Sequence, residues 1–358
     1  MDNNTVIIGG GIFGLTTAII LAENGNKVIL LERNYDLLKK ASLVNQNRIH
    51  YGYHYPRSIE TGSESIKGMN DFLDYYGDCI NDSYPKFYAI SKKNSLISSD
   101  DFKIFTKKLN IPLENAWPEK NKLNRNLIEE CWRVYEPSFD YMTLRINILK
   151  RIEKLKNITI YRNVDIQDIK INESGIDVKV FNNHIIKAKY LVNATYSDLG
   201  NILKMSLNED IKSKFQLLVL PILRTNDIKS NYGITIMDGP FCSIVPRGFS
   251  KNEYILSNVK GSVIENFEGT KKPKWKFFNG NIENKIINKS SKYFPNIKQM
   301  DCIDSWITTK MILPNKEKND ARPTLVIKNH KKIFSVFSGK ITTCVSAAKQ
   351  ILNYIKES

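Results

Sequence analysis

The stretch TVIIGGGIFGLTTAIILAENGNKVILLER, residues 5–33, decides the fold of this chain. Its first four residues and residues 27–32 are short apolar runs, and both predict buried strands. Residues 12–24 between them predict a helix, which Gly25 ends. The stretch therefore predicts a strand, a helix and a second strand that follow one another directly.

A glycine motif lies at the first turn of this unit. Gly9, Gly11 and Gly14 form Gly-x-Gly-x-x-Gly between strand and helix, and Glu32 closes the second strand. Gly9 permits the sharp turn, Gly11 lets the backbone approach a pyrophosphate, and Gly14 lets the helix pack on the strand. The start of the helix offers N–H groups to phosphates, and Glu32 is suited to a ribose diol, which disfavours NADP. The motif predicts a dinucleotide site and by itself leaves both FAD and NAD open.

The composition is that of a globular, enzyme-sized protein, with 358 residues of which 42% are hydrophobic. No apolar run approaches the ~20 residues that cross a bilayer, and the first residues lack a signal-peptide pattern, so we expect a cytoplasmic protein. The five cysteines are scattered, so neither a disulfide framework nor a metal site is expected. The net charge of +16 is spread along the chain, which disfavours nucleic-acid binding and favours an acidic substrate.

The rest of the chain lacks the regular strand–helix alternation of a plain NAD-dependent dehydrogenase. Helical patterns occur at residues 63–76, 143–155 and 342–355. Strand-like segments occur at residues 84–91, 158–162, 166–171, 176–181, 185–187, 190–195, 215–224, 232–237, 241–245, 253–258 and 332–337. We expect a small antiparallel meander over residues 158–187 and a second antiparallel sheet after residue 215, whereas residues 101–141 show helical pieces and no strong motif.

The sequence resembles the D-amino-acid-oxidase-like superfamily of FAD-dependent oxidoreductases, which includes relatives of glycerol-3-phosphate dehydrogenase and 2-hydroxyglutarate oxidase. The stretches that carry the resemblance are Val6–Arg33, Ala41–Ser58, Tyr190–Ser197, Met237–Pro246, Asp320–Pro323 and Phe337–Ala348. The resemblance implies FAD, bound non-covalently, and an α/β fold. A Rossmann-like FAD-binding domain of the glutathione-reductase-like ββα type is expected at residues 1–80, 143–205 and 320–358, with an α+β substrate domain on an antiparallel sheet at 81–142 and 206–319.

Two short elements point to the cofactor through this resemblance. Ser338–Thr343 is similar to the Gly-Gly-Lys-x-Thr-Thr turn of glycerol-3-phosphate dehydrogenases, which lies against the flavin ring. Asn193–Thr195 is similar to an element near the FAD pyrophosphate, with Tyr196 where glycine is usual. The residues expected to bind FAD are Gly9, Gly11, Ile12, Phe13, Gly14, Glu32, Arg33, Ser42, Asn45, Gln46, Arg48, Val164, Ala194, Thr195, Gly339, Lys340, Ile341 and Thr342.

The stretch NQNRIHYGYHYPR, residues 45–57, holds the candidate catalytic side chains. In an extended conformation its period of two puts Arg48, His50, Gly52 and His54 on one face. The side chains of the other face are expected to pack against the rest of the protein. The resemblance places this segment beside the isoalloxazine, where Gly52 lets the strand lie close to the ring. The candidate catalytic residues are His54, His50, Arg48 and Tyr53, and the candidate substrate-binding residues are Tyr55, Arg57, Arg247 and Arg322.

The function expected from these residues is hydride transfer from the C–H bond of a small, anionic hydroxy or amino compound to flavin N5, with oxygen or a carrier as electron acceptor. Arginine suits an anionic group because guanidinium binds carboxylate or phosphate through two hydrogen bonds. Two alternatives stay open. One is a membrane-peripheral, quinone-linked dehydrogenase, and the other is a non-catalytic, FAD-stabilised subunit for RNA modification or binding.

Overall fold

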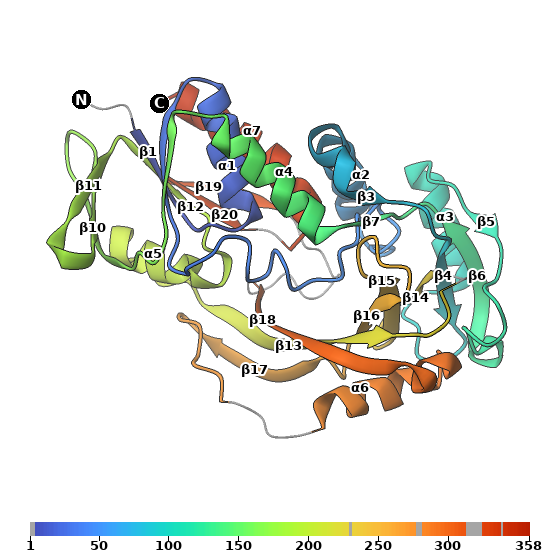
Figure 1. Ribbon diagram of the computed structural model, residues 1–358. Coiled ribbons are helices and arrows are strands. Elements are labelled where there is room, and N and C mark those ends of the chain that lie inside the picture. Colours follow the sequence, from blue (N-terminus) through green and yellow to red (C-terminus); the bar gives the residue numbers. More distant parts are fainter. Residues whose placement is uncertain (1–3, 229–230, 277–280, 313–323, 338) are drawn as a thin grey trace.

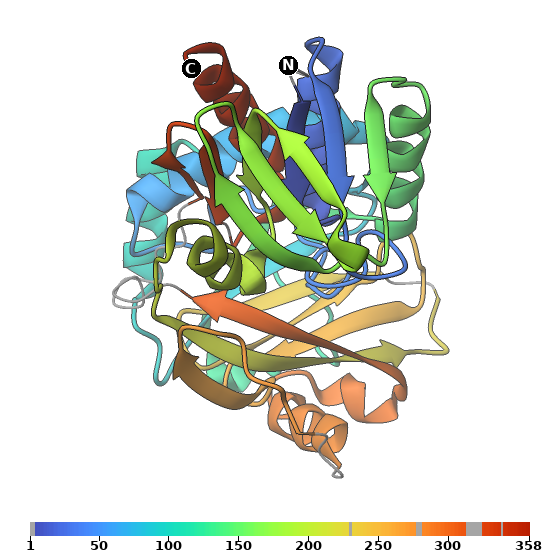
Figure 2. The ribbon, with the colours of Figure 1, turned by 90° about the vertical axis from the view of Figure 1, so that its left-hand side faces the viewer.

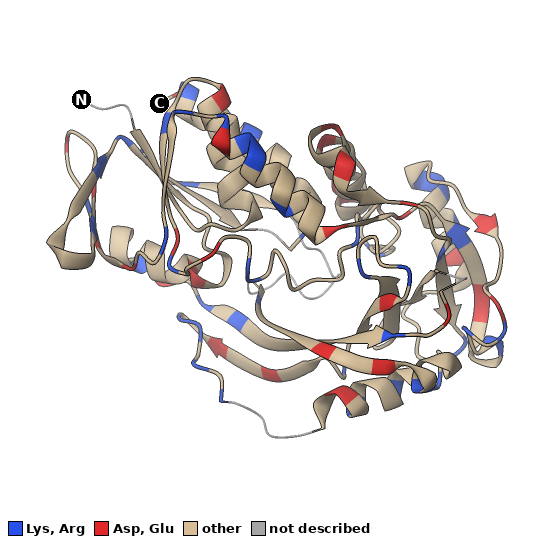
Figure 3. Ribbon diagram, in the orientation of Figure 1, with Lys and Arg blue, Asp and Glu red and all other residues tan. Residues whose placement is uncertain are grey.

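The computed structural model describes residues 4–228, 231–276, 281–312, 324–337 and 339–358. Within these residues the elements form two main layers, each built on a sheet, and the long connection that follows residue 31 runs between them (Figure 1). None of the described helices is long and apolar enough to cross a membrane. Lys and Arg are scattered over both layers among Asp and Glu (Figure 3), so the positive charge does not form a single stripe on the ribbon.

The first layer holds a six-stranded sheet. Its order is β19 (Leu325–His330), β20 (Ile333–Phe337), β12 (Tyr190–Asn193), β1 (Asn4–Ile8), β2 (Lys27–Leu31) and β8 (Ile158–Tyr161). All neighbours are parallel except β19, which pairs antiparallel with β20. The predicted strand–helix–strand unit is confirmed, and the C-terminal strand lies two places from β1, so the two ends of the chain share one sheet.

Alternating side chains of this sheet bury both of its faces. Ile7 and Phe334 pack under a helical layer, whereas Val6 and Ile333 pack on the opposite face. The helical layer comprises α1 (Ile12–Glu23), α7 (Cys344–Lys356), α4 (Tyr141–Glu153) and α2 (Ile59–Tyr76). The other face is covered by an antiparallel sheet of β9 (Ile166–Ile171), β10 (Ile176–Val180) and β11 (Ile185–Ala188), which lies in front in Figure 2.

The predicted meander has three strands rather than four, because β8 joins the parallel sheet beside β2. Two helices also begin earlier than their apolar pattern indicated. The side chain of Asp140 caps α4 by accepting from the backbone N–H of Thr143 at 2.7 Å, and Ser58 caps α2 in the same way. The sequence pattern therefore located these elements, while polar capping residues set their first turns.

The second layer holds a nine-stranded sheet. Its order is β17 (Val263–Gly269), β13 (Ser213–Arg224), β16 (Glu253–Asn258), β15 (Cys242–Pro246), β14 (Gly233–Met237), β4 (Lys86–Ser91), β6 (Ile128–Val134) and β5 (Glu114–Asn115), with β18 (Asp301–Ile312) also paired to β13. The expected antiparallel sheet is confirmed, except that β4 and β14 are parallel. Residues 101–141 contain the strands β5 and β6, which the sequence did not reveal.

The remaining elements complete the two layers. Helix α6 (Ile282–Ser291) covers the outer face of the nine-stranded sheet, where Ile286 packs with side chains of β14, β15 and β16. The other elements are α3 (Ser99–Leu109), α5 (Leu199–Leu207), and the short pair β3 (Ile80–Asn81) and β7 (Ser138–Phe139). The inner face of the nine-stranded sheet is left to line a cavity.

Candidate active site

A cavity of about 520 Å³ lies between the two sheets. At one wall it meets the first turn of α1, at Gly11, Ile12 and Phe13. At the opposite wall it meets inward-facing residues of the nine-stranded sheet, among them Thr235 and Ser243. The cavity therefore joins the predicted cofactor turn to the predicted substrate sheet.

The glycine turn is shaped for close contact with a ligand. Gly9 has a φ of +111°, and a Cβ there would lie 2.6 Å from the carbonyl oxygen of Ala194. A Cβ at Gly14 would lie 1.9 Å from the carbonyl oxygen of Gly9, so only glycine fits. Gly11 is the N-cap of α1 and has no side chain between the helix start and the cavity. These residues fit the pyrophosphate of FAD, which the first turn of α1 would hold through backbone N–H groups.

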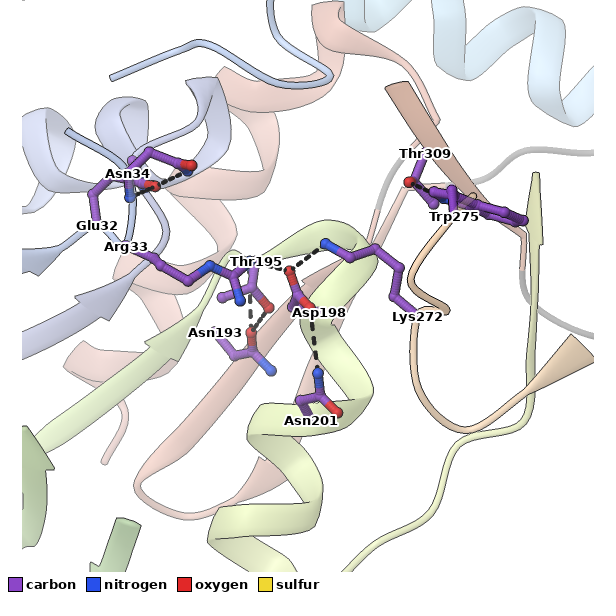
Figure 4. Close-up of polar contacts among 11 residues, drawn as sticks. Glu32, Arg33, Asn34, Asn193, Thr195, Asp198, Asn201, Lys272, Trp275 and Thr309 are labelled. Atoms are coloured by element: carbon purple, nitrogen blue, oxygen red, sulfur yellow. Dashed lines mark hydrogen bonds and ion pairs between the residues drawn. The ribbon is translucent and has the colours of Figure 1, made fainter. Parts of the chain in front are cut away.

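The acidic residue at the end of β2 is held by its own loop (Figure 4). Glu32 accepts hydrogen bonds from the backbone N–H of Gly10 at 2.6 Å and of Asn34 at 2.7 Å, and also from the side-chain amide of Asn34. A carboxylate has about four lone-pair positions, so Glu32 can still accept from a ribose. It does not line the cavity, and its ribose role stays a prediction.

The neighbouring Arg33 takes part in an ion-pair group at the same edge (Figure 4). Its Nη2 lies 2.6 Å from Oδ2 of Asp198, and Nζ of Lys272 lies 3.1 Å from the same oxygen. Burial opposes ionisation of Asp198, but Lys272 and Arg33 outweigh it and lower the pKa of this carboxyl. Lys272 follows β17, so the group ties the two layers together beside the cofactor turn.

Tyr196 occupies the position where the resembling family has glycine, and its backbone explains that preference. Its φ is +54°, in the left-handed region that glycine adopts at low cost. Its hydroxyl oxygen accepts from the backbone N–H of Met311 in β18 at 3.2 Å. Ala194 and Tyr196 line the cavity, whereas Thr195 does not. The hydroxyl of Thr195 instead donates to Oδ1 of Asn193 at 2.7 Å.

The C-terminal turn reaches the cavity, and its contact with the flavin ring stays a prediction. Gly339, Lys340 and Ile341 line it, while Ser338 lies outside the described residues and Thr342 is buried without lining it. The Lys340 side chain is fully buried and forms an ion pair with Glu64 of α2, a partner that the sequence did not reveal. Burial lowers the pKa of Lys340, against the opposing effect of Glu64.

The segment 45–57 is not the extended strand that its alternation predicted. Gly52 has a φ of +93°, and the residues around it form turns. A Cβ at Gly52 would lie 3.3 Å from the carbonyl oxygen of Gly62, so the missing side chain serves the contact with α2. The turn nevertheless brings His50 and His54 together, because their rings stack with centroids 5.1 Å apart and both line the cavity.

A buried polar cluster lies beneath these histidines and is centred on Glu136, between β6 and β7. Oε1 of Glu136 accepts from Nδ1 of His50 at 3.0 Å and from the hydroxyl of Tyr88 at 2.8 Å. Oε2 lies 3.8 Å from Nη1 of Arg48 and 3.7 Å from Nζ of Lys86. The Glu136 side chain is fully buried, so one carboxylate serves two cations and two hydrogen-bond donors.

Strand register places the cations of this cluster. Lys86 and Tyr88 are two residues apart in β4 and so share one face, and Thr235 of the parallel strand β14 lies opposite Tyr88. Oγ1 of Thr235 accepts from Nζ of Lys86 at 2.9 Å and from Nη1 of Arg48 at 3.0 Å. A Cβ at Gly233 would lie 2.8 Å from Cδ of Lys86, so this glycine gives the lysine its room.

Burial and the shared carboxylate set the charges of the cluster. Burial raises the pKa of Glu136, but Arg48 and His50 outweigh it and hold the value at about 2. Burial lowers the pKa of His50, against its bond to Glu136. Burial also lowers the pKa of Lys86 to about 7, although Glu136 opposes the shift. At neutral pH the cluster holds an ionised Glu136, a neutral His50 and a charged Arg48, and burial weakens the hold of Lys86 on its proton.

The structure brings together only part of the predicted site. Of the predicted residues, the cavity is lined by Gly11, Ile12, Phe13, Ser42, Asn45, Gln46, Arg48, His50, His54, Tyr55, Ala194, Gly339, Lys340 and Ile341. The hydroxyl of Tyr53 lies elsewhere and donates to the carbonyl of Pro112 at 2.7 Å. Val164 lies next to Glu32, to whose carbonyl its N–H donates at 3.0 Å.

Arg57 and Arg247, two of the predicted substrate-binding arginines, do not line the cavity. Arg57 pairs with Asp238 at 2.5 Å, and Arg247 pairs with Glu253 at 2.9 Å. Arg322 lies outside the described residues. Their roles in substrate binding stay predictions.

The sequence missed Glu136 and Lys86. Glu136 belongs to a polar stretch without a motif, and nothing in its neighbourhood marks it. Lys86 carries a weak signal, because a lysine at the start of an otherwise apolar strand is costly to bury and needs a partner. The buried charges of the site are therefore the part that only the fold reveals.

A dinucleotide turn, a cavity between two sheets and a buried ionised cluster are the features of a flavin-dependent oxidoreductase of two-domain type. A family profile described as FAD dependent oxidoreductase, DAO, matches residues 4–317. The chain belongs to this family. The predicted resemblance, the Rossmann-like fold with a second sheet domain, and the use of FAD by an oxidoreductase are thereby confirmed.

Individual relatives are distant. The chain is 35% identical to the FAD-dependent monooxygenase FPY4 of Fusarium mangiferae over 97 residues, which are 27% of this chain and 26% of that protein. It is 22% identical to the FAD-dependent monooxygenase kojA of Aspergillus flavus in an alignment of 379 residues. This alignment covers 98% of this chain and 85% of that protein. The solved structure of glycine oxidase from Geobacillus kaustophilus is similar to this chain with a TM-score of 0.79 and 13% sequence identity. The superposition covers 99% of this chain and 95% of the oxidase, so the two share a fold.

Proposed function

We propose that this flavoenzyme oxidises a small, anionic hydroxy or amino compound, with non-covalently bound FAD as the hydride acceptor. One observation carries the proposal. The guanidinium of Arg48 is buried and borders the cavity, and its Nε has no hydrogen-bond partner among the described residues. The Nε atom itself is covered in this structure, so an anionic group in the cavity would be held by the positive charge of Arg48 and by the part of this residue that lines the cavity.

The charge of the buried cluster supports an anionic substrate. Arg48 is always ionised, and the basic side chain of Lys86 lies beside it, so that two basic groups share the single carboxylate of Glu136. The cavity wall near Arg48 therefore carries an excess of positive charge that water reaches poorly. Since electrostatic interactions strengthen in such surroundings, a carboxylate is the group that fits.

The residues around the cavity divide the work of oxidation. FAD, when bound, supplies the redox chemistry by accepting a hydride. Gly11 and the first turn of α1, with Lys340 at the C-terminal turn, would hold the cofactor, and Arg48 would orient the anionic group. His50 or His54 would accept the hydroxyl or amine proton, because both line the cavity. Apolar side chains such as Leu220 and Phe241 exclude water from the same space.

The visible spectrum of the purified protein tests this proposal first. We expect the two-banded spectrum of a flavin, and acid precipitation is expected to release the chromophore as FAD into the supernatant. The flavin is then expected to bleach anaerobically with a hydroxy or amino acid and not with the corresponding uncharged amide. A colourless protein that takes up no added FAD contradicts the cofactor, and equal bleaching by acid and amide contradicts the anion site.

A further inference from the structure

We propose that Glu136 is a positioning residue that holds His50 with its proton on Nδ1, so that Nε2 takes the proton of the substrate. The inference rests on the proposed function and goes further, because it names which histidine is the base and what fixes it. Glu136 lies 86 residues from His50 in the chain. Its part in the site follows only from the fold.

The backbone holds the two residues in a fixed relation. Ile49 donates its N–H to the carbonyl of Pro137 at 2.9 Å, and Phe139 donates to the carbonyl of Asn47 at 2.8 Å. These bonds flank an antiparallel bridge between Arg48 and Ser138. The segment with His50 is thereby fastened to the segment with Glu136 on both sides of the contact.

The hydrogen bond to Glu136 decides the tautomer of His50. An ionised carboxylate accepts hydrogen bonds and donates none. Oε1 of Glu136 lies 3.0 Å from Nδ1 of His50, so Nδ1 is the ring nitrogen that carries the proton. Nε2 of the neutral ring then holds a lone pair. It has no hydrogen-bond partner in the described part of the chain, and the residue lines the cavity, where a substrate proton can reach it.

A role as counter-ion alone explains Glu136 less well. Its distances to Arg48 and Lys86, 3.8 and 3.7 Å, are those of ion pairs without a hydrogen bond. Both cations instead donate to Thr235 at 3.0 and 2.9 Å. The short hydrogen bonds of Glu136 go to His50 and Tyr88. The cations attract Oε2 and so turn Oε1 towards the imidazole.

In the proposed step the substrate loses one proton and one hydride. The hydroxyl or amine of the substrate gives its proton to Nε2 of His50, and its α C–H bond breaks with both electrons. The hydride goes to FAD, and a C=O or C=N bond forms in the product. His50 becomes an imidazolium, which Glu136 stabilises across Nδ1–H, and releases its proton to water.

Nitrogen NMR of the histidine rings tests the inference without any substrate. The chain has four histidines, and His50→Gln identifies the signals of His50 by their loss. We expect the Nδ1–H tautomer in the FAD-loaded wild type. In Glu136→Gln the amide oxygen is expected to face Arg48 and Lys86, so that the NH₂ group faces His50 and moves the proton to Nε2.

The matched control is Tyr88→Phe, which removes the other donor to Oε1 but keeps the carboxylate, and is expected to leave the tautomer unchanged. A wild-type His50 with its proton on Nε2 overturns the inference, and needs no variant that might misfold. A Glu136→Gln protein that keeps the Nδ1–H tautomer overturns it as well.

Reduction kinetics test the catalytic consequence. The anaerobic rate of flavin reduction by a substrate that bleaches the wild type is expected to fall by ~10²–10⁴-fold in Glu136→Gln, with FAD retained. An altered tautomer with an unchanged rate overturns the use of His50 as base. If no hydroxy or amino acid reduces the wild type, the proposed function fails, while the NMR spectra separately support or overturn the positioning by Glu136.

Discussion

Gly14→Ala is expected to yield a protein that loses its flavin on purification. The added Cβ would lie 1.9 Å from the carbonyl oxygen of Gly9, which is backbone and cannot rotate away. Either the turn or α1 must shift, at a cost near the upper end of the ~1–3 kcal/mol found for overpacked cores. Because the same turn is the proposed pyrophosphate site, FAD affinity is expected to fall by roughly 100-fold. The flavin absorbance per protein and a titration with FAD measure this effect.

Gly77→Ala is the matched control for this change. Gly77 follows α2 with a φ of −54°, and no heavy atom lies within 4 Å of a Cβ built there. The substitution adds the same Cβ atom, but at Gly77 this atom clashes with nothing and the backbone conformation is one that alanine readily adopts. Full flavin content is therefore expected. If Gly14→Ala keeps its flavin as Gly77→Ala does, the turn at Gly9–Gly14 is not where FAD is held.

The parts of the fold that the sequence predicted depend on local patterns. The unit β1–α1–β2 is continuous in sequence, and its glycine spacing has one steric explanation. The short inner strands of the second sheet are also visible, because both of their faces are buried and they read as apolar runs. The strand β18, in contrast, is exposed or half-buried at all positions except Trp306 and Met311 and has a weak apolar signal.

The sequence indicated the candidate catalytic side chains that lie in one segment, but not the partner that reaches them from elsewhere in the chain. His50, His54 and Arg48 belong to a single segment, so their clustering could be seen from spacing, even though Gly52 bends the segment and the extended geometry is wrong. Glu136 reaches the same place through a contact between segments 86 residues apart. Contacts of this kind depend on tertiary register, which no short-range pattern encodes.

Arg48→Met is expected to weaken binding of the anionic substrate while leaving the flavin in place. Methionine keeps much of the length of the side chain but removes the charge and the donors. Loss of one partner from a buried, charged hydrogen-bonded pair costs about 2–4 kcal/mol, which is roughly a 30- to 1,000-fold loss of affinity. The substrate dependence of anaerobic flavin reduction measures this loss for any acid that bleaches the wild type.

Arg247→Met is the matched control, because its guanidinium pairs with Glu253 at 2.9 Å and does not line the cavity. The proposed anion site at Arg48 predicts that substrate affinity stays at the wild-type value in this variant, whereas the role expected for Arg247 from the sequence predicts that it falls. Weakened binding in Arg247→Met together with normal binding in Arg48→Met would instead place the anion site near Arg247. Flavin content, measured in both proteins, separates a loss of substrate binding from a loss of the folded cofactor site.

The pH dependence of Arg48→Met follows from the same charges. Burial is the main cause that lowers the pKa of His50, and the positive charges of Arg48 and Lys340 lower it further, whereas Glu136 raises it. Removing Arg48 therefore raises this pKa. A base works only when it is unprotonated, so the acidic limb of the flavin-reduction profile is expected to move to higher pH in Arg48→Met. An acidic limb that stays in place would show that the group titrating there is not His50 beside Arg48.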